Sequence, residues 1–433
     1  MQYIEICGNN RLDGSIAVQG AKNSALPILA GAVLTMGESV LSRCPDLSDV
    51  DACLRIIRCL GGSATRSGDV VTVSGRGIGE CAVPQSLMRE MRSSIIFLGS
   101  VAARCGRACM YLPGGCKIGA RPIDLHLKAL RELGYKITFD GSNICCERAN
   151  AHGGTVKLAF PSVGATENVI LASVLLSGRT TIINAAREPE ICDLADYLNS
   201  AGAKISGAGS TVIEIEGVTK LHSAEHTVMP DRIAASTLMC AAASASGRIC
   251  LKSINSAHVA SVIDVFRQMG GKIAATVNEI TVEFTDRPRA VNSIVTGVYP
   301  GFPTDSQAPV MAALCKAHGR SAITETIFEN RLQHVHELRK FGADIKVCGN
   351  TATVTGVNVL NGANVNCTDL RGGAALIIAA LGAQGKSRIY NIEHIDRGYE
   401  NTERQLAQLG ADIRRVNDEK GQQTKTQYKA HSA

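Results

Sequence analysis

The chain has 433 residues, of which 45% are hydrophobic, 19% are charged and 4% are aromatic, with no tryptophan and a formal net charge of +6. This length exceeds a single ordinary core and predicts two or three globular domains. The scarcity of aromatic side chains argues against nucleic acid as a partner, and the mild basic excess suits a small anionic ligand better.

The first residues and the cysteines indicate the cellular compartment that we expect for the protein. The first residues lack the basic head and apolar segment of a secretory leader, and no apolar run reaches the roughly 18 residues that a membrane span needs. We therefore expect no membrane association. The chain has 16 cysteines, which we expect to be reduced thiols in the cytoplasm rather than a disulfide framework. Cys105, Cys109, Cys116, Cys145 and Cys146 lack the paired spacing of a structural zinc site, so we predict no metal and no cofactor.

An internal repeat with a period of roughly 70 residues runs through the chain. In each copy, an amphipathic helical pattern ends at a glycine suited to a left-handed C-cap, and β-branched strand patterns follow. These glycines are Gly61, Gly134, Gly202, Gly270, Gly342 and Gly410.

A second glycine ends an Ala- and Leu-rich helical pattern in every copy. These glycines are Gly37, Gly106, Gly178, Gly247, Gly319 and Gly385. One unit therefore runs helix, strand, helix, strand, strand, and six units suggest two domains of three. The strands exclude an all-helical solenoid, and the G-x-G-x-x-G fingerprint of a doubly wound nucleotide fold is missing. We expect the boundary between residues 218 and 230, and a disordered polar tail over residues 417–433.

Polar residues gather where the Ala-rich helices begin. Lys22 and Asn23 begin the first of these helices, Arg92 enters the second, and residues 162–166 precede the third. Because a helix N-terminus attracts anions, these residues are candidates for binding phosphate groups. The alternative is an ordinary helix start with Ser24 as the cap and a solvated lysine.

Cys116 lies on a predicted loop, because a Pro-Gly-Gly turn directly precedes it. Lys117 and Arg121 stand nearby, and fixed positive charge lowers the pKa of a thiol. Pro122 is suited to the first position of a helix that we expect over residues 122–133. The alternative is a glycine turn that carries a cysteine by chance.

Three further charged residues stand at the edges of apolar or glycine-rich segments. Asp305 precedes an apolar run, where it supplies a carboxylate or caps a helix. Arg371 follows Asp369 by two residues, and Arg397 directly follows Asp396, so each arginine serves either an anionic substrate or a local ion pair.

Together these segments resemble the UDP-N-acetylglucosamine enolpyruvyl transferase family, also called 1-carboxyvinyltransferases, in order from about residue 1 to residue 416. The matching segments are residues 20–23, 112–116, 118–122, 162–166, 187–190, 302–305, 328–331 and 395–400. The resemblance implies an α/β fold of six βαβαββ-type repeats, three per domain, in the inside-out α/β barrel of enolpyruvyl transferases. It implies an N-terminal domain over residues 22–229, and a C-terminal domain that joins residues 1–21 to residues 230–416.

The resemblance also implies an activity. The family transfers the enolpyruvyl group of phosphoenolpyruvate to the 3′-hydroxyl of UDP-N-acetylglucosamine and releases phosphate, as the committed step of peptidoglycan synthesis. Carried over by resemblance, Cys116 is the general acid, Asp305 is the base near the sugar hydroxyl, and Lys22 and Arg397 belong to the catalytic set. An epoxide such as fosfomycin would then modify Cys116.

The implied binding residues fall into two groups. Those for phosphoenolpyruvate are Lys22, Asn23, Arg121, Arg371 and Arg397. Those for the UDP-sugar are Asn23, Arg92, Arg121, Pro122, Ile123, Asp124, Leu125, Ser162, Val163, Gly164, Asp305 and Ile327.

One departure and two alternatives remain. Some members have a lysine where this chain has Phe160, which removes one basic contact to the diphosphate. The alternatives are the sister enzyme 5-enolpyruvylshikimate-3-phosphate synthase, which shares the fold and the reaction type, and a non-catalytic repeat scaffold that binds a sugar nucleotide.

Overall fold

Six Ala-rich helices form the interior of the part of the molecule that the structure describes. The computed structural model describes residues 2–112 and 123–417. These helices are buried along most of their length, and they pack against one another in two groups of three. The first group is α1 (Lys22–Ala32), α4 (Phe97–Cys105) and α6 (Val163–Ser173), and the second is α8 (Arg232–Ser244), α10 (Thr304–Leu314) and α12 (Leu370–Gly382).

Six amphipathic helices alternate with the interior ones along the chain and bury one face each. They are α2 (Ser48–Cys59), α5 (Asp124–Glu132), α7 (Pro189–Ser200), α9 (Ala260–Gln268), α11 (Val335–Lys340) and α13 (Thr402–Gln408). The glycine two residues after each helix has a φ between 84° and 98°, which confirms the left-handed C-cap predicted from the repeat. Further short helical segments are α3 (Gln85–Glu90), η1 (Arg92–Ile96), η2 (Ser256–Val259) and η3 (Ile392–His394).

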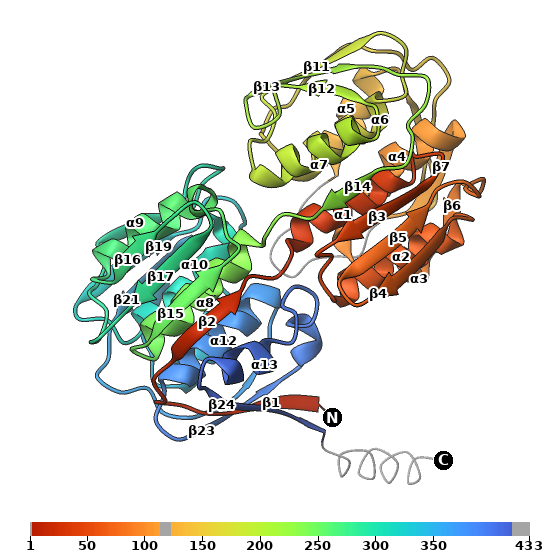
Figure 1. The fold of residues 1–433 in the computed structure, drawn as a ribbon. Coiled ribbons are helices and arrows are strands. Elements are labelled where there is room, and N and C mark those ends of the chain that lie inside the picture. The colour runs from red at the N-terminus through yellow and green to blue at the C-terminus, as the bar shows by residue number, and fades with distance from the viewer. Residues whose placement is uncertain (1, 113–122, 418–433) are drawn as a thin grey trace, which may run out of the picture.

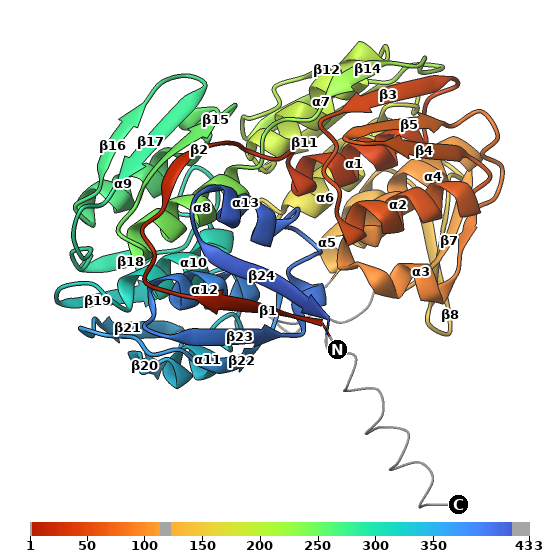
Figure 2. The same ribbon diagram turned by 60° about the horizontal axis from the view of Figure 1, so that its bottom comes forward.

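In the described residues the strands form six four-stranded sheets, and three of them surround each group of helices (Figures 1 and 2). We call each group of helices with its three sheets a lobe. In the first lobe the sheets are β14 (Glu225–Thr227), β3 (Glu38–Ser42), β5 (Val70–Ser74) and β4 (Ser63–Ser67); β6 (Ala82–Val83), β7 (Arg107–Tyr111), β9 (Asn143–Glu147) and β8 (Lys136–Asp140); and β10 (Thr155–Lys157), β11 (Arg179–Ile183), β13 (Val212–Glu216) and β12 (Lys204–Ser206).

The sheets of the second lobe follow the same plan. They are β2 (Asp13–Ala17), β15 (Arg248–Lys252), β17 (Glu279–Glu283) and β16 (Lys272–Ala275); β18 (Ser293–Val295), β19 (Arg320–Thr324), β21 (Thr351–Thr355) and β20 (Asp344–Cys348); and β22 (Asn364–Asn366), β23 (Lys386–Tyr390), β1 (Gln2–Cys7) and β24 (Asp412–Asn417).

Every sheet has one parallel pair followed by two antiparallel pairs. The predicted order of helix, strand, helix, strand, strand is therefore confirmed, except that β1 fills the third place in the sixth sheet. The short strand of each parallel pair followed from the resemblance and not from the residue pattern, because two to five residues carry too little periodicity to be seen.

Within residues 2–112 and 123–417, the chain crosses between the lobes twice. Strand β2 pairs with β15 in the second lobe, and the chain then enters α1 of the first lobe; β14 pairs with β3 in the first lobe, and the chain then enters α8 of the second. The crossings are hydrogen-bonded to each other, since Ala21 N donates to Met229 O at 2.7 Å and Asp231 N donates to Gln19 O at 2.8 Å. The two segments that connect the lobes thus form a paired joint.

The buried apolar side chains form two separate clusters. One cluster lies within residues 25–228, and the other combines residues 4–18 with residues 234–413. We call the corresponding parts the N-terminal lobe (residues 22–229) and the C-terminal lobe (residues 2–21 and 230–417), and we propose that each is a domain. Among the described residues, no helix is long and apolar enough to cross a membrane.

Candidate functional site

Several predicted site residues occupy the first turns of the interior helices. Lys22 is the first residue of α1, Asp305 is the second of α10, and Arg371 is the second of α12. Asp305 does not cap its helix, because the N-cap position is Pro303 and no side chain caps that end. Ser24 lies inside α1 and donates to Asp193 instead of capping. The repeat therefore brings chemically different side chains to equivalent helix starts.

Asp49 joins Lys22 to Arg397. Its carboxylate lies 3.0 Å from Lys22 Nζ and 2.9 Å from Arg397 Nε. Asp49 and Lys22 belong to the N-terminal lobe, whereas Arg397 follows η3 in the C-terminal lobe. Burial alone would raise the pKa of Asp49, but the charges of Lys22 and Arg397 outweigh it and lower the pKa. This ion pair therefore crosses between the lobes and keeps two predicted anion-binding side chains together.

Asp305 lies between two buried arginines. Arg371 Nε is 2.9 Å and Arg331 Nη2 is 3.0 Å from the same oxygen, Oδ1 of Asp305. Each guanidinium also lies over an aromatic ring, Arg371 over Tyr399 and Arg331 over Phe328, both at 5.2 Å from the ring centre. Burial would raise the pKa of Asp305, but the two guanidinium groups hold it well below its ordinary value. Asp305 is thus ionised, and the arginines are fixed in place.

Both arginines keep a donor available. Among the described residues, nothing accepts a hydrogen bond from the buried Nε of Arg331 or the buried Nη1 of Arg371. A buried donor without a partner costs about 1–3 kcal/mol, and a charged one costs more. We propose that a phosphate or carboxylate oxygen accepts these bonds when substrate binds, which would remove this cost and neutralise the positive charge.

The two ionic clusters influence each other. Burial lowers the pKa of the Lys22 ammonium, Asp49 opposes this, and the positive charges of Arg371 and Arg397 lower it further. The backbone N–H of Lys22 also donates to Asp231 Oδ2 at 3.3 Å, where Asp231 caps α8 of the other lobe. The cations predicted for phosphoenolpyruvate, as far as the structure describes them, therefore share one electrostatic environment where the lobes meet.

The comparisons with known proteins identify the family. A family model described as EPSP synthase (3-phosphoshikimate 1-carboxyvinyltransferase) matches residues 6–406. The chain belongs to this family of enolpyruvyl transferases. It is 47% identical over 416 residues to UDP-N-acetylglucosamine 1-carboxyvinyltransferase 2 of Caldanaerobacter subterraneus subsp. tengcongensis, covering 96% of this chain and 100% of the relative. It is 44% identical over 418 residues to UDP-N-acetylglucosamine 1-carboxyvinyltransferase of Geobacter metallireducens, with the same two coverages.

Solved structures show the same enolpyruvyl transferase fold. The enolpyruvyl transferase NikO from Streptomyces tendae superposes with a TM-score of 0.87 at 24% identity, covering 96% of this chain and 99% of that one. EPSP synthase from Acinetobacter baumannii superposes with a TM-score of 0.73 at 18% identity, covering 96% of this chain and 100% of that one. The predicted fold class and the predicted reaction class are therefore confirmed.

The residues predicted for the UDP-sugar come from adjoining elements of this enolpyruvyl transferase. Arg92 begins η1, Asp124 and Leu125 begin α5, and Ser162 caps α6 ahead of Val163 and Gly164. The helices α5 and α6 contact each other, and α6 contacts η1. A side chain at Gly164 would approach the His126 ring to 3.1 Å, so the glycine keeps these helix starts close together. This N-terminal group remains a proposal for binding the UDP-sugar.

The remaining predicted residues have mixed outcomes. Asn23 is the half-buried second residue of α1, and Ile123 is the half-buried residue before α5. Ile327 lies in the C-terminal lobe, where its backbone N–H donates to Glu325 Oε1 at 2.8 Å. Cys116, Arg121 and Pro122 lie outside the described residues, as does the predicted tail from residue 418. The expected helix over residues 122–133 is described from Asp124, as α5.

Two residues that complete the ionic clusters were missed as site residues. Asp49 lies in the first turn of the amphipathic helix α2, where an acidic residue is ordinary and carries no local signal. Arg331 belongs to a segment that matches the family, and this membership was the signal that could have identified it. The buried pair of Arg232 and Glu190, 2.9 Å apart across the lobes, was also missed.

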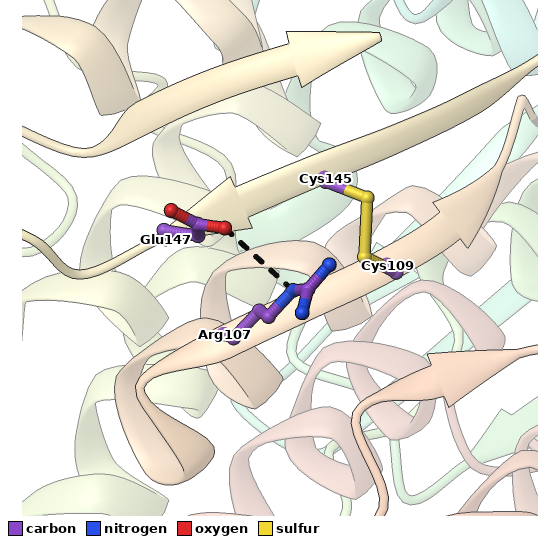
Figure 3. The surroundings of a disulfide bond; sticks show 4 residues. All are labelled: Arg107, Cys109, Cys145 and Glu147. Carbon is purple, nitrogen blue, oxygen red and sulfur yellow. Dashed lines mark ion pairs between the residues drawn. A yellow bond between two sulfur atoms is a disulfide. The ribbon is translucent and has the colours of Figure 1, made fainter. Parts of the chain in front are cut away.

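The prediction that all cysteines are reduced thiols was wrong for one pair. Cys109 on β7 and Cys145 on β9 form a disulfide, and Arg107 and Glu147 form an ion pair beside it (Figure 3). The register places the two cysteines directly opposite each other in the sheet, with their Cα atoms 4.2 Å apart. Spacing along the chain cannot show this contact, because 36 residues separate the two positions. The other cysteines that the structure describes are free.

Proposed function

We propose that this enolpyruvyl transferase transfers the enolpyruvyl group of phosphoenolpyruvate to the 3′-hydroxyl of UDP-N-acetylglucosamine with release of phosphate, as a cytoplasmic step of peptidoglycan synthesis. The observation that carries the choice of acceptor is the full-length identity of 44–47% with relatives named for UDP-N-acetylglucosamine. The alternative acceptor, shikimate 3-phosphate, is supported by the family model but not by these relatives.

The ionic clusters suit the chemistry of phosphoenolpyruvate. This substrate carries a phosphate and a carboxylate, so it needs several fixed cations within a small volume. Lys22, Arg397, Arg371 and Arg331 supply such cations from both lobes. Because the guanidinium groups of Arg331 and Arg371 are almost completely buried, water screens their charge weakly and their attraction for an anion is strong.

The reaction proceeds by addition and elimination. A proton added to C3 of phosphoenolpyruvate makes C2 cationic, the sugar hydroxyl attacks C2, and its proton is transferred to a base. The tetrahedral adduct then loses phosphate from C2 and a proton from C3, which restores the double bond. In this proposal Asp305 is the base, ionised and one-third exposed beside its two arginines, and Cys116 is the acid, by resemblance alone.

Phosphate release tests the proposal. The purified chain should release phosphate when phosphoenolpyruvate and UDP-N-acetylglucosamine are both present, and should release none with phosphoenolpyruvate and shikimate 3-phosphate. If phosphate is released with phosphoenolpyruvate and shikimate 3-phosphate, but not with phosphoenolpyruvate and UDP-N-acetylglucosamine, the proposed acceptor is rejected in favour of the sister reaction. No release with either pair, together with binding of the UDP-sugar in calorimetry, would favour a binding scaffold.

The role of Cys116 has its own test. An epoxide that resembles phosphoenolpyruvate, such as fosfomycin, should stop phosphate release and add its mass to the peptide that contains Cys116. The free cysteines elsewhere in the chain provide internal controls, among them the exposed Cys59 and Cys348. A label on one of these residues, with Cys116 unmodified, would reject the assignment.

A further inference from the structure

Glu325 is a buried carboxylate that accepts hydrogen bonds from uncharged donors, namely backbone N–H groups and threonine hydroxyls. It directly follows β19 and is 2% exposed. Among the described residues, no lysine, arginine or histidine forms an ion pair with it. Burying a carboxylate without a counter-charge is costly unless its oxygens accept several hydrogen bonds. The hydrogen-bond donors around Glu325 therefore show which segments this carboxylate connects.

The two oxygens of Glu325 bind different parts of the site. Oε1 accepts from the backbone N–H groups of Ile327 at 2.8 Å and Phe328 at 3.2 Å, and from Thr296 Oγ1 at 3.0 Å. Oε2 accepts from Thr304 Oγ1 at 2.8 Å. One carboxylate thus connects the turn after β19, the end of β18 and the start of α10.

Both connections lead to Asp305. Thr304 is the first residue of α10 and the immediate neighbour of Asp305. On the other side, the ring of Phe328 lies under the Arg331 guanidinium, which pairs with Asp305 at 3.0 Å. Glu325 therefore fixes the helix start that carries the carboxylate and also the turn that supports one of its two arginine partners.

We propose that Glu325 is a positioning residue for the transfer reaction, which sets the place of Asp305 relative to Arg331 and the turn at Ile327. The inference rests on the proposed function, because it assigns Asp305 to the chemistry. In this proposal Glu325 acts through Thr304 and the turn after β19, and not by contact with a substrate. A displacement of a reacting group by about 1 Å can cost about 100-fold in rate, so the loss of this support should appear in turnover rather than in substrate binding.

The mildest test removes a single bond. Thr304→Val keeps the shape of the side chain and deletes only the donor to Oε2, so we expect kcat to fall about tenfold while the KM values for both substrates stay within about threefold. The matched control is Thr324→Val on β19, whose hydroxyl bonds to Thr351 at 2.9 Å and not to Glu325. The control should keep kcat within about twofold of the unchanged chain.

Two substitutions at Glu325 complete the series. Glu325→Ala removes all four bonds, and we expect kcat to fall by at least about 30-fold. Glu325→Gln should recover most of this loss, because its amide oxygen can accept from the turn and its NH2 group can donate to Thr304. If Glu325→Ala fails to fold, Thr304→Val decides the question. Thermal unfolding of each variant reports stability separately.

The outcomes are distinct. Reduced kcat in Thr304→Val and recovery in Glu325→Gln support the proposal. An unchanged kcat in Thr304→Val overturns it, and so does a lowered melting temperature in Glu325→Ala with kcat intact. Failure of the unchanged chain to release phosphate with UDP-N-acetylglucosamine would instead reject the proposed function, and the same series would then be measured with whichever acceptor supports turnover.

Discussion

Two carboxylates in the C-terminal lobe, Asp305 and Glu5, are each surrounded by cationic side chains. At Asp305 the carboxylate is more exposed than its partners, whereas at Glu5 the partners are more exposed than the carboxylate. Asp305 has a side chain that is 30% exposed, between Arg331 and Arg371, which are 5% exposed. Glu5 on β1 is itself 5% exposed, and its partners Lys386, Arg388 and Arg414 are 43–69% exposed. The first cluster lies where the lobes meet, and the second lies on the sheet of β22, β23, β1 and β24 (Figure 2).

We propose that this difference separates a binding site, at Asp305, from a structural ion cluster, at Glu5. Water and salt screen the exposed cations around Glu5, so their positive charge has little effect beyond the sheet. The side chains of Arg331 and Arg371 are almost completely buried, and one nitrogen of each has no hydrogen-bond acceptor among the described residues. In our proposal these weakly screened cations bind the anionic groups of the substrate.

The largest expected effect is the loss of turnover in Asp305→Ala. Removal of a general base typically costs 100-fold or more, so we expect kcat to fall by at least about 100-fold while the Kd of the UDP-sugar changes much less. Steady-state kinetics and calorimetry would measure the two quantities. An unchanged kcat would remove Asp305 from the mechanism and would make the two carboxylates equivalent.

A smaller effect is expected from the pH dependence at Lys22. Burial lowers the pKa of this ammonium below its ordinary value of 10.5, so its positive charge should be lost earlier as the pH rises. We expect the affinity for inorganic phosphate, measured by calorimetry, to fall about tenfold as Lys22 loses its proton with rising pH. A tenfold loss corresponds to the free energy of one hydrogen bond to a charged group.

Lys22→Arg sharpens the test, because a guanidinium keeps its charge over the whole range. The decline in phosphate affinity with rising pH should be absent from this variant. A decline of the same size in Lys22→Arg would assign the titration to another group.

The smallest effect is expected at the second carboxylate. Glu5→Gln should leave kcat within about twofold and lower the free energy of unfolding at pH 7 by about 1 kcal/mol, the usual size for pairs with exposed partners. Arg414 and the other cations outweigh burial and lower the pKa of Glu5 from 4.5 to about 2. The contribution of Glu5 is therefore fully present above pH 4.5 and is lost as the pH falls toward 2.

Urea unfolding of the protein and of the Glu5→Gln variant, at pH 7 and at pH 3, would measure this contribution. The difference between the chains should be smaller at pH 3. A difference that stays constant with pH would mean that Glu5 stabilises the sheet by packing and not by charge. A large loss of activity in Glu5→Gln would contradict the separation of the two clusters.

The repeat was predictable because its signals are local. A left-handed glycine after an amphipathic helix and an Ala-rich run before a second glycine can each be read within a few residues, and both recur six times. The placement of the N-terminal segment in the sheets of the C-terminal lobe could not be read from nearby residues. Strands β1 and β2 pair with β23, β24 and β15, and only the family resemblance pointed to this arrangement.

Charge pairing was the least predictable feature. Neighbours in sequence suggested Asp369 for Arg371 and Asp396 for Arg397 as local ion pairs. Instead, Asp369 caps α12 through backbone N–H groups, and Asp396 pairs with Arg415. The arginine side chains extend to Asp305 and Asp49. A long side chain pairs with whichever carboxylate the packing of the helices brings near, and proximity along the chain does not determine this.

The amino-acid sequence by itself determined the six-fold repeat, the two kinds of helix and the types of side chain at the helix starts, because periodicity and backbone preference act over short distances. Only the tertiary structure decided which of those side chains meet. The crossing of the chain between the lobes brings Asp49 to Arg397, the packing of α10 and α12 brings Asp305 to Arg371, and the register of β7 and β9 brings Cys109 to Cys145. These contacts depend on how distant segments pack, which the order of residues does not display.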